Sequence, residues 1–190
     1  MLDVDTKIFE GVLKGKRHAQ NMLFKKYAPL MLGICMRYAH NKAEAEDMVQ
    51  EGFIKIFTKA GGYRGDGSFE GWMKRIMINT AITYFKKNQK HRFHTDMDEV
   101  DETIAAEDEP EHDMDNVNLP KTQLMNLIQG LPEGYRMVFN LYVFEQYSHQ
   151  DIADQLGISV NTSKSQLSKA RRLLISKITR LTGTKKIAIT

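Results

Sequence analysis

Apolar residues recur every three or four positions through much of the chain, and no alternating run is long enough for a convincing strand. This spacing is typical of the buried face of an α-helix. Only four prolines interrupt the 190 residues, and the good helix formers Met, Lys, Gln, Leu and Ala are plentiful. The pattern therefore predicts an all-α protein.

The segment 43–60 carries a clear helical stripe. Its predicted core side consists of Ala45, Val49, Phe53 and Ile56, with Phe57 at the edge. The opposite side presents Asp47, Gln50, Glu51 and Ile54. An exposed isoleucine beside acids favours a protein contact, because acids repel phosphate. A single exposed isoleucine is, however, common on any surface.

A glycine-rich loop, 61–68, leads into a further predicted helix, which Ser68 can cap. The predicted inner face of that helix consists of Phe69, Met73, Ile76, Thr80 and Tyr84. Along one flank follow Trp72, Arg75, Asn79, Thr83 and Lys86. An aromatic ring, an amide and cations in one row suit single-stranded nucleic acid. The alternative is that Trp72 is a core residue with a charged rim.

The last third of the chain has the pattern of a helix-turn-helix. An apolar helix follows Pro132, with Met137, Val138, Leu141, Tyr142 and Phe144 at helical spacing. Ser148 and Asp151 then form a capping-box pattern, and Gly157 suits the end of that short helix. Ser159 or Asn161 can cap the helix that comes next. A short helix, a turn with glycine and a second helix define the motif.

The final predicted helix is basic on its exposed side. Residues 161–180 contain six lysines and arginines and no acid, and no Asp or Glu follows Asp154. The predicted apolar stripe is Leu167, Ala170, Leu174, Ile178 and Leu181. The far side carries Ser165, Ser168, Lys169 and Arg172, with Lys164 at its margin. Such a face fits the major groove of DNA, or it is a solvated basic surface.

Charge divides the chain into three parts. Residues 94–115 hold 11 of the 24 acids and no lysine or arginine, which leaves 27 bases against 13 acids elsewhere. The acidic stretch has few large apolar residues, so we expect a linker that is flexible when free. We therefore predict two small helical domains, 1–90 and 119–190, joined by an acidic linker over 91–118.

Several classes of protein are disfavoured by the sequence. No segment approaches the roughly 20 apolar residues of a membrane span, and the N-terminus lacks a signal pattern, so we expect a cytoplasmic protein without membrane insertion. Cys35 is the only cysteine, and its apolar neighbours predict a buried thiol. The histidines are scattered and the acids cluster in the linker, so we predict no catalytic site, no metal and no cofactor.

Four segments in order, AEDMVQEGFIKIF, YRGDGSFEGWMKRIMINTAITYFKK, LPEGYRMVF and YSHQDIADQLGISVNTSKSQLSKARRLL, resemble the extracytoplasmic-function (ECF) group of bacterial RNA polymerase sigma-70 family factors. The resemblance implies a sigma factor. Its first domain would bind core RNA polymerase and the promoter −10 element, and its second would read the −35 element. It also implies an inhibitory anti-sigma factor as a partner.

The resemblance also implies roles for individual residues. The polymerase-binding positions would be Asp47, Gln50, Glu51, Phe53 and Ile54. In the −10 region the resemblance implies that 61–68, with Tyr63, Arg64 and Ser68, is the specificity loop, and that Asn79 lies beside a pocket for a flipped base. The polar flank of the next helix adds Trp72, Arg75 and Lys86 as −10 positions. The resemblance implies Lys164, Ser165, Ser168 and Lys169 as −35 positions, and the exposed face of the same helix adds Arg172. Two departures are Ser163, where valine is usual on the buried side, and Gln166, where an arginine usually supports phosphate contact.

Two questions stay open at the level of sequence. A self-sufficient dimeric helix-turn-helix regulator of duplex DNA would explain the second domain equally well, but it gives loop 61–68 and Ile54 no role. The acidic linker is either a solvated spacer or, as in similar linkers of the family, a mimic of the RNA backbone in the polymerase channel.

Overall fold

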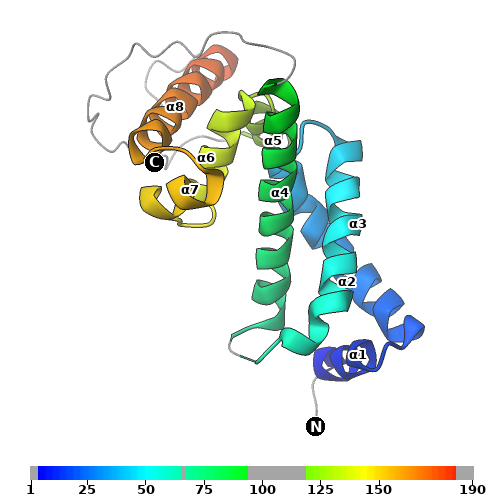
Figure 1. Cartoon of the computed structure of the whole chain (residues 1–190). Helices are drawn as coiled ribbons and strands as arrows, with labels where there is room; N and C mark the ends of the chain where they lie inside the picture. Colours follow the sequence, from blue (N-terminus) through cyan, green and yellow to red (C-terminus); the bar gives the residue numbers. More distant parts are fainter. Residues whose placement is uncertain (1–3, 66, 94–118, 183–190) are drawn as a thin grey trace. The chain divides into compact units, whose positions relative to one another are not determined.

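The computed structural model describes residues 4–65, 67–93 and 119–182, and every regular element in these ranges is helical (Figure 1). The predicted all-α class is therefore confirmed for this part of the chain. Two compact units are present, Met1–Tyr84 and Phe85–Thr190. No helix in the described ranges is long and apolar enough to cross a membrane. The predicted acidic linker lies almost wholly outside the described residues.

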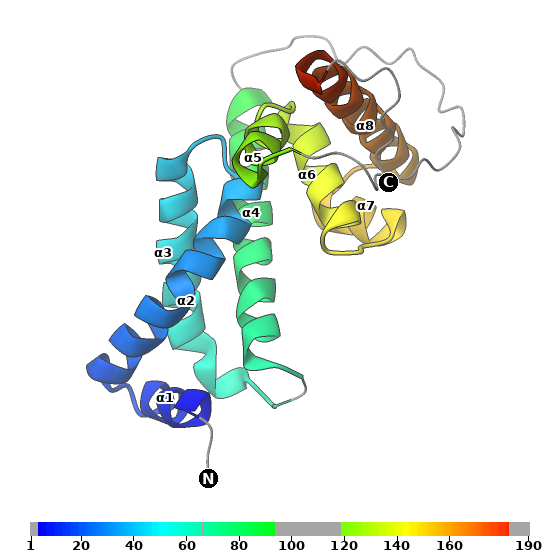
Figure 2. The same cartoon turned by 180° about the vertical axis from the view of Figure 1, so that it is seen from behind.

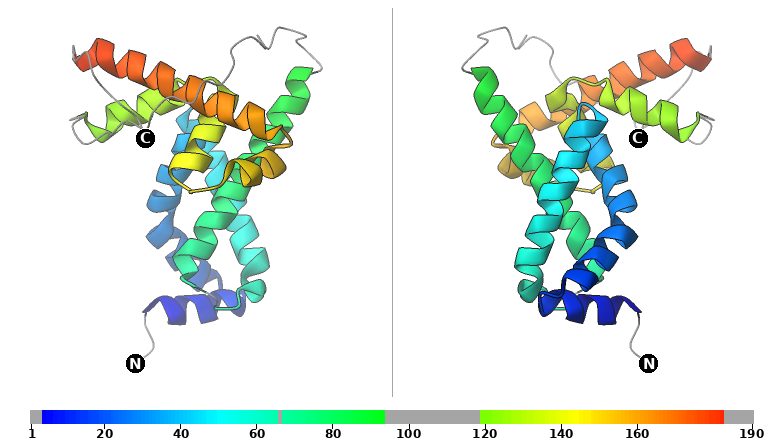
Figure 3. Two further views of the ribbon diagram at one scale, coloured as in Figure 1. Left: turned by 90° about the vertical axis from the view of Figure 1, so that its left-hand side faces the viewer. Right: turned by 90° about the vertical axis from the view of Figure 1, so that its right-hand side faces the viewer.

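The first unit is a helical bundle with one crossing helix. It contains α1 (Val4–Leu13), α2 (Arg17–Tyr38), α3 (Lys42–Lys59), the short 3-10 turn η1 (Ala60–Gly62) and the first part of α4 (Phe69–Phe93). Helix α1 lies across the end of the bundle that α2, α3 and α4 form (Figures 2 and 3). Gly11 of α1 faces Ala19 of α2 so closely that an added Cβ would lie 2.5 Å from the Ala19 Cβ.

Helices α2 and α3 supply much of the core of the first unit. Leu23, Met31 and Cys35 of α2 are fully buried. The predicted stripe on α3 is confirmed, since Ala45, Val49, Phe53 and Ile56 are all buried. Helix α3 begins one residue before the predicted segment 43–60, and the Asn41 side chain caps it by accepting a hydrogen bond from the Glu44 backbone N–H at 2.9 Å.

The buried face of α4 differs from the prediction. Met73 and Thr80 are buried as expected, but Phe69, Ile76 and Tyr84 are only half-buried. The residues that replace them in the core are Met77, Ile78, Ala81, Ile82 and Phe85. A reason is visible on α3, where Gly52 has no side chain and leaves room for Met77. The periodicity of a single helix could not reveal this neighbour. The observed buried face of α4 is therefore rotated about the helix axis relative to the predicted one.

The second unit contains the last part of α4 together with α5 (Lys121–Gln129), α6 (Glu133–Val143), α7 (His149–Leu156) and α8 (Val160–Thr182). Helices α5, α6 and α7 each contact α8. The predicted capping box of α7 is confirmed: the Asp151 N–H donates to Ser148 Oγ at 3.1 Å, and the Ser148 N–H donates to Asp151 Oδ2 at 3.0 Å. Gly157 ends the helix with φ 72°, a left-handed conformation that glycine adopts without strain.

Helix α8 begins and ends somewhat differently from its pattern. Of the two cap candidates, Ser159 is the one used, because its Oγ accepts from the Thr162 N–H at 2.9 Å. Four of the five predicted stripe residues, Leu167, Ala170, Leu174 and Ile178, are buried. The fifth, Leu181, is 60% exposed, so its placement in the core was wrong.

Arg136 is a core residue that the sequence did not predict. It is 1% exposed and is counted among the largest fully buried side chains of the described chain. Its Nη1 donates to the carbonyl oxygen of Gln129 at 2.7 Å and to that of Leu131 at 3.4 Å. A cation suits this position, because the C-terminal carbonyls of α5 carry partial negative charge. Arg136 thereby fastens the end of α5 to α6.

Candidate polymerase and DNA interfaces

The outer face of α3 carries the residues predicted to bind the polymerase. Asp47, Gln50 and Ile54 are exposed, and Ile54 is 62% exposed, the largest fraction among the large apolar side chains of the described chain. Phe53 is only 2% exposed. In this structure it supports the face from the core and does not form part of its surface. The face therefore combines one apolar side chain with acids and an amide.

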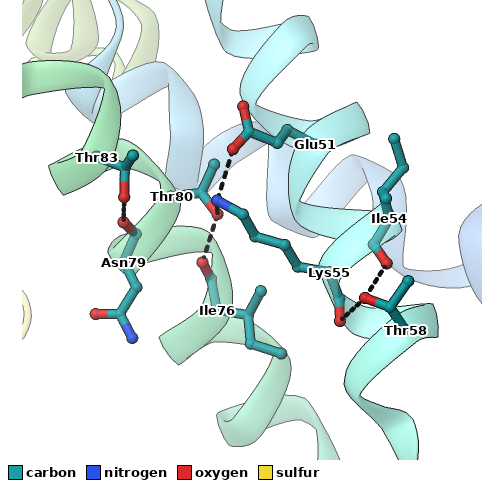
Figure 4. A network of polar contacts seen from close by, with 8 residues as sticks. All are labelled: Glu51, Ile54, Lys55, Thr58, Ile76, Asn79, Thr80 and Thr83. Atoms are coloured by element: carbon teal, nitrogen blue, oxygen red, sulfur yellow. Dashed lines mark hydrogen bonds and ion pairs between the residues drawn. The ribbon is translucent and has the colours of Figure 1, made fainter. Parts of the chain in front are cut away.

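Glu51 connects this face to α4 through a polar network (Figure 4). Its carboxylate pairs with Lys55 Nζ at 2.6 Å, and Lys55 Nζ also donates to Thr80 Oγ1 at 3.2 Å. Burial, followed by the charge of Glu51 and a hydrogen bond with it, raises the pKa of the Tyr84 hydroxyl. The Ile54 side chain points away from this network. Glu51 is thus held between α3 and α4, whereas Ile54 is free to contact another protein.

Loop 61–68 has a defined path at the residues that are described. The Tyr63 hydroxyl donates to the Gly67 carbonyl oxygen at 2.6 Å and closes the loop. Gly65 and Gly67 have φ of 80° and 104°, which side chains rarely adopt. Ser68 caps α4 as predicted, accepting from the Gly71 N–H at 3.0 Å. Arg64 and Ser68 are exposed at the surface of this loop.

An aromatic cluster fixes the base of the loop. The ring of Phe69 stacks on Trp72 at 5.6 Å, and Tyr63 lies 5.6 Å from Trp72. Phe9 of α1 completes the cluster, 4.6 Å from Phe69 and 5.3 Å from Tyr63. Trp72 is therefore half-buried in a cluster, which agrees in part with the alternative of a core residue, while its role at nucleic acid stays a prediction. Phe9 was missed because nothing in the sequence connects it to a loop more than fifty positions away.

The polar flank of α4 remains open to solvent. Arg75, Asn79 and Lys86 are all exposed. The Thr83 hydroxyl donates to the Asn79 carbonyl oxygen at 2.8 Å, whereas the Asn79 side-chain amide makes no hydrogen bond to the described part of the chain (Figure 4). The structure thus places an available amide and two cations on one side of the helix that follows the loop.

The predicted reading residues lie together on the outer side of α8. Lys164 and Arg172 are exposed, and Ser165, Ser168 and Lys169 are half-exposed. The Ser165 hydroxyl donates to the Thr162 carbonyl oxygen at 3.0 Å, which leaves the lone pairs of its oxygen as acceptors. The face combines cations that reach guanine or phosphate with hydroxyls that accept from bases.

The two departures from the family pattern both have partners inside the second unit. Ser163 is completely buried, and its Oγ lies 2.9 Å from His149 Nδ1. The His149 ring stacks on Tyr142 at 4.7 Å. Partial burial, Lys164 and Arg171 together lower the pKa of His149. The amide of Gln166 packs against Gly134, where an added Cβ would lie 3.2 Å from Nε2.

Comparison with known families identifies both units. Residues 23–91 match the model of sigma-70 region 2, and residues 121–174 match the model of sigma-70 region 4. The chain is 32% identical over 183 residues to the RNA polymerase sigma-H factor of Pseudomonas aeruginosa, with 90% of this chain and 91% of that one covered. It is 30% identical over 181 residues to the ECF RNA polymerase sigma-E factor of Escherichia coli K12, with 92% and 94% covered.

The two helical units with these surfaces are those of a sigma-70 type transcription factor. Within that class, the chain belongs to the extracytoplasmic-function group of RNA polymerase sigma factors, as the family models and these relatives together show. Because both halves match, the alternative of a self-sufficient dimeric regulator, which accounts only for the second half, is set aside.

Two solved structures are also similar to this chain. One is CnrH in complex with the cytosolic domain of CnrY, with a TM-score of 0.48, 17% identity, and 94% of this chain and 99% of that chain covered. The other is the sigma factor RpoE in complex with the anti-sigma factor NepR from Bartonella quintana, with a TM-score of 0.49, 19% identity, and 85% and 97% covered.

Proposed function

We propose that this sigma factor binds core RNA polymerase through the outer face of α3, captures the −10 element with loop 61–68 and α4, and reads the −35 element with α8. The observation that carries this proposal is the separation of surfaces. An apolar and acidic face suited to protein lies on α3, while basic polar faces lie on the flank of α4 and on α8. One chain thus offers one surface to the polymerase and two to DNA.

The −10 element would be held as single-stranded DNA. A base that leaves the stack costs a few kcal/mol, which contacts in the complex must offset. The free amide of Asn79 suits the polar edge of such a base, and Arg75 and Lys86 suit its backbone. The aromatic cluster around Trp72 would hold loop 61–68 in place before DNA arrives.

The −35 element would be read as a duplex by α8. Each good base contact there contributes about 1–3 kcal/mol of discrimination. Neither unit needs to bind DNA tightly alone, because docking both on one polymerase raises their effective concentration at a promoter. The chain would work in the cytoplasm, where it carries out no bond-making step of its own. An inhibitory anti-sigma protein that covers Ile54 would keep it from the polymerase.

The polymerase surface is tested by Ile54→Lys. A charge on the exposed apolar residue should weaken affinity for core polymerase by more than tenfold, which is the size of a strong interface residue. Asn21→Lys is the matched control, because Asn21 is an exposed residue of α2 that gains the same charge. A titration of labelled core polymerase gives both affinities. Equal affinity of Ile54→Lys and the parent chain would remove α3 from the interface.

A further inference from the structure

A cluster of three nitrogen-bearing side chains lies where α7 meets α8. His149 is the first residue of α7, and Lys164 and Arg171 belong to the first half of α8. The His149 ring stacks on Tyr142, and the Arg171 guanidinium lies 5.7 Å from the centre of the same Tyr142 ring. None of the three forms an ion pair with an acid in the described part of the chain. The cluster therefore has uncompensated positive charge.

The imidazole of His149 is held on two sides. Its Nδ1 lies 2.9 Å from Oγ of Ser163, a residue with no exposed surface. Its face lies 4.7 Å from the Tyr142 ring at an interplanar angle of 25°. Nε2, on the opposite side of the imidazole from Nδ1, makes no hydrogen bond to the described residues. When the Ser163 hydroxyl donates to Nδ1, Nε2 carries the proton and can donate it outward.

We propose that His149 Nε2, together with Lys164 and Arg171, binds one backbone phosphate of the −35 duplex. The inference rests on the proposed function of α8. In a helix-turn-helix the first helix crosses the DNA backbone while the second enters the major groove, and α7 is the first helix here. Half or more of protein–DNA hydrogen bonds go to the sugar-phosphate backbone. Ser163 and Tyr142 are positioning residues that orient the imidazole for this contact.

The pairing also gives a reason for the unusual serine. A valine at position 163 would offer Nδ1 no partner, so the imidazole would lose one of its two supports. Asp151, the nearest acid of α7 in sequence, is engaged in the capping box with Ser148.

The test scans the phosphates of a promoter duplex one by one. Holoenzyme made from the full chain and core polymerase is bound to a promoter found by run-off transcription, and single phosphates around the −35 element are replaced by neutral methylphosphonates. For the parent chain, one position should weaken binding by about tenfold, the loss expected for a hydrogen bond to a charged group. For the double variant His149→Phe/Ser163→Val, the same replacement should weaken binding by less than about twofold.

The double variant keeps an aromatic ring on Tyr142 and leaves no buried hydroxyl without a partner. In Lys164→Ala, replacing this phosphate or its neighbour by a methylphosphonate should likewise weaken binding by less than about twofold. Because Lys164 is exposed, its replacement should not disturb folding. Arg180→Ala is the control, because it removes one exposed charge from the far end of the same helix. It should leave the phosphate profile unchanged.

Two results would overturn the phosphate site. In the first, the variants bind the unmodified promoter duplex as tightly as the parent does. In the second, they bind every duplex of the methylphosphonate series more weakly by the same factor, which means that His149 only maintains structure. A parent holoenzyme that gives no transcript at all would instead contradict the proposed function. In that case, the salt dependence of full-chain binding to an arbitrary duplex still tests the contact, with the slope of log affinity against log salt falling by about one in Lys164→Ala, which removes a charge, and staying unchanged in Arg180→Ala.

Discussion

Cys35 shows how burial changes the acid–base chemistry of a residue. It is fully buried in α2, and burial raises the pKa of its thiol from 9.0 to about 12, while the charge of Arg37 opposes the change. The thiol form is therefore favoured in the folded chain. Stability from this group is complete below pH 9 and declines as the pH rises toward 12, because the unfolded chain ionises first.

We expect Cys35 to react with a thiol reagent at pH 8 only as fast as the first unit opens. In denaturant the same thiol should react at the rate of a free cysteine, so the ratio of the two rates reports the opening free energy. The absorbance of the released reagent measures both rates. Reaction in buffer as fast as in denaturant would contradict a buried thiol.

Other residues show where sequence reasoning ends. The exposed and buried sides of α3 and most of α8 follow from helical periodicity, because each residue's environment there depends on its position around one helix. Arg136 could not be predicted, since arginine is almost never fully buried unless a partner compensates it, and its partners are carbonyl groups of another helix. His149 and Ser163 are 14 positions apart, and only packing shows that they form a pair.

At the scale of elements, replacement of two glycines by alanine should change the stability of the chain in opposite directions. Gly11→Ala should destabilise the chain by about 1–3 kcal/mol, because its Cβ would press on Ala19 and push α1 from α2. Gly33 lies exposed in α2 with nothing within 4 Å of an added Cβ, so Gly33→Ala should stabilise by about 0.5–1 kcal/mol. Denaturant unfolding of both variants measures the difference. Equal stability of the two variants would contradict the close packing of α1.

Helix caps were the most predictable features at this scale. Ser68, Ser148 and Gly157 act at the helix ends that local chemistry indicated, because caps bond to backbone groups two to four residues away. The inner face of α4 was less predictable, because several neighbours decide which side is buried. The roles of α3, α4 and α8 at the polymerase and at DNA stay predictions until the variants are measured.

At the scale of the whole molecule, the acidic segment 94–115 joins two units whose exposed faces are partly basic. The segment lies outside the described residues, so the choice between spacer and RNA mimic stays open to experiment. We expect amide replacement of its acids to weaken holoenzyme formation and to change the ratio of abortive to full-length transcripts. The acids to replace are Asp98, Glu99, Asp101, Glu102, Glu107, Asp108, Glu109 and Glu111.

The control for this variant is a neutral Gly/Ser linker of equal length, since reach depends chiefly on the number of residues. If charge is what matters, both neutral linkers should weaken holoenzyme formation and change the transcript ratio to the same extent. Gel analysis of the transcripts measures the ratio of abortive to full-length products. An unchanged ratio together with unchanged affinity for polymerase would show that the segment is only a spacer.

The central claim is that this chain gives core polymerase its choice of promoter. Run-off transcription on genomic fragments, with core polymerase and the purified chain added separately and together, tests it most directly. We predict discrete transcripts only when both are present, and their loss with Ile54→Lys but not with Asn21→Lys. Sequence-specific binding of duplex DNA by the chain alone, with no transcript when polymerase is added, would contradict the account.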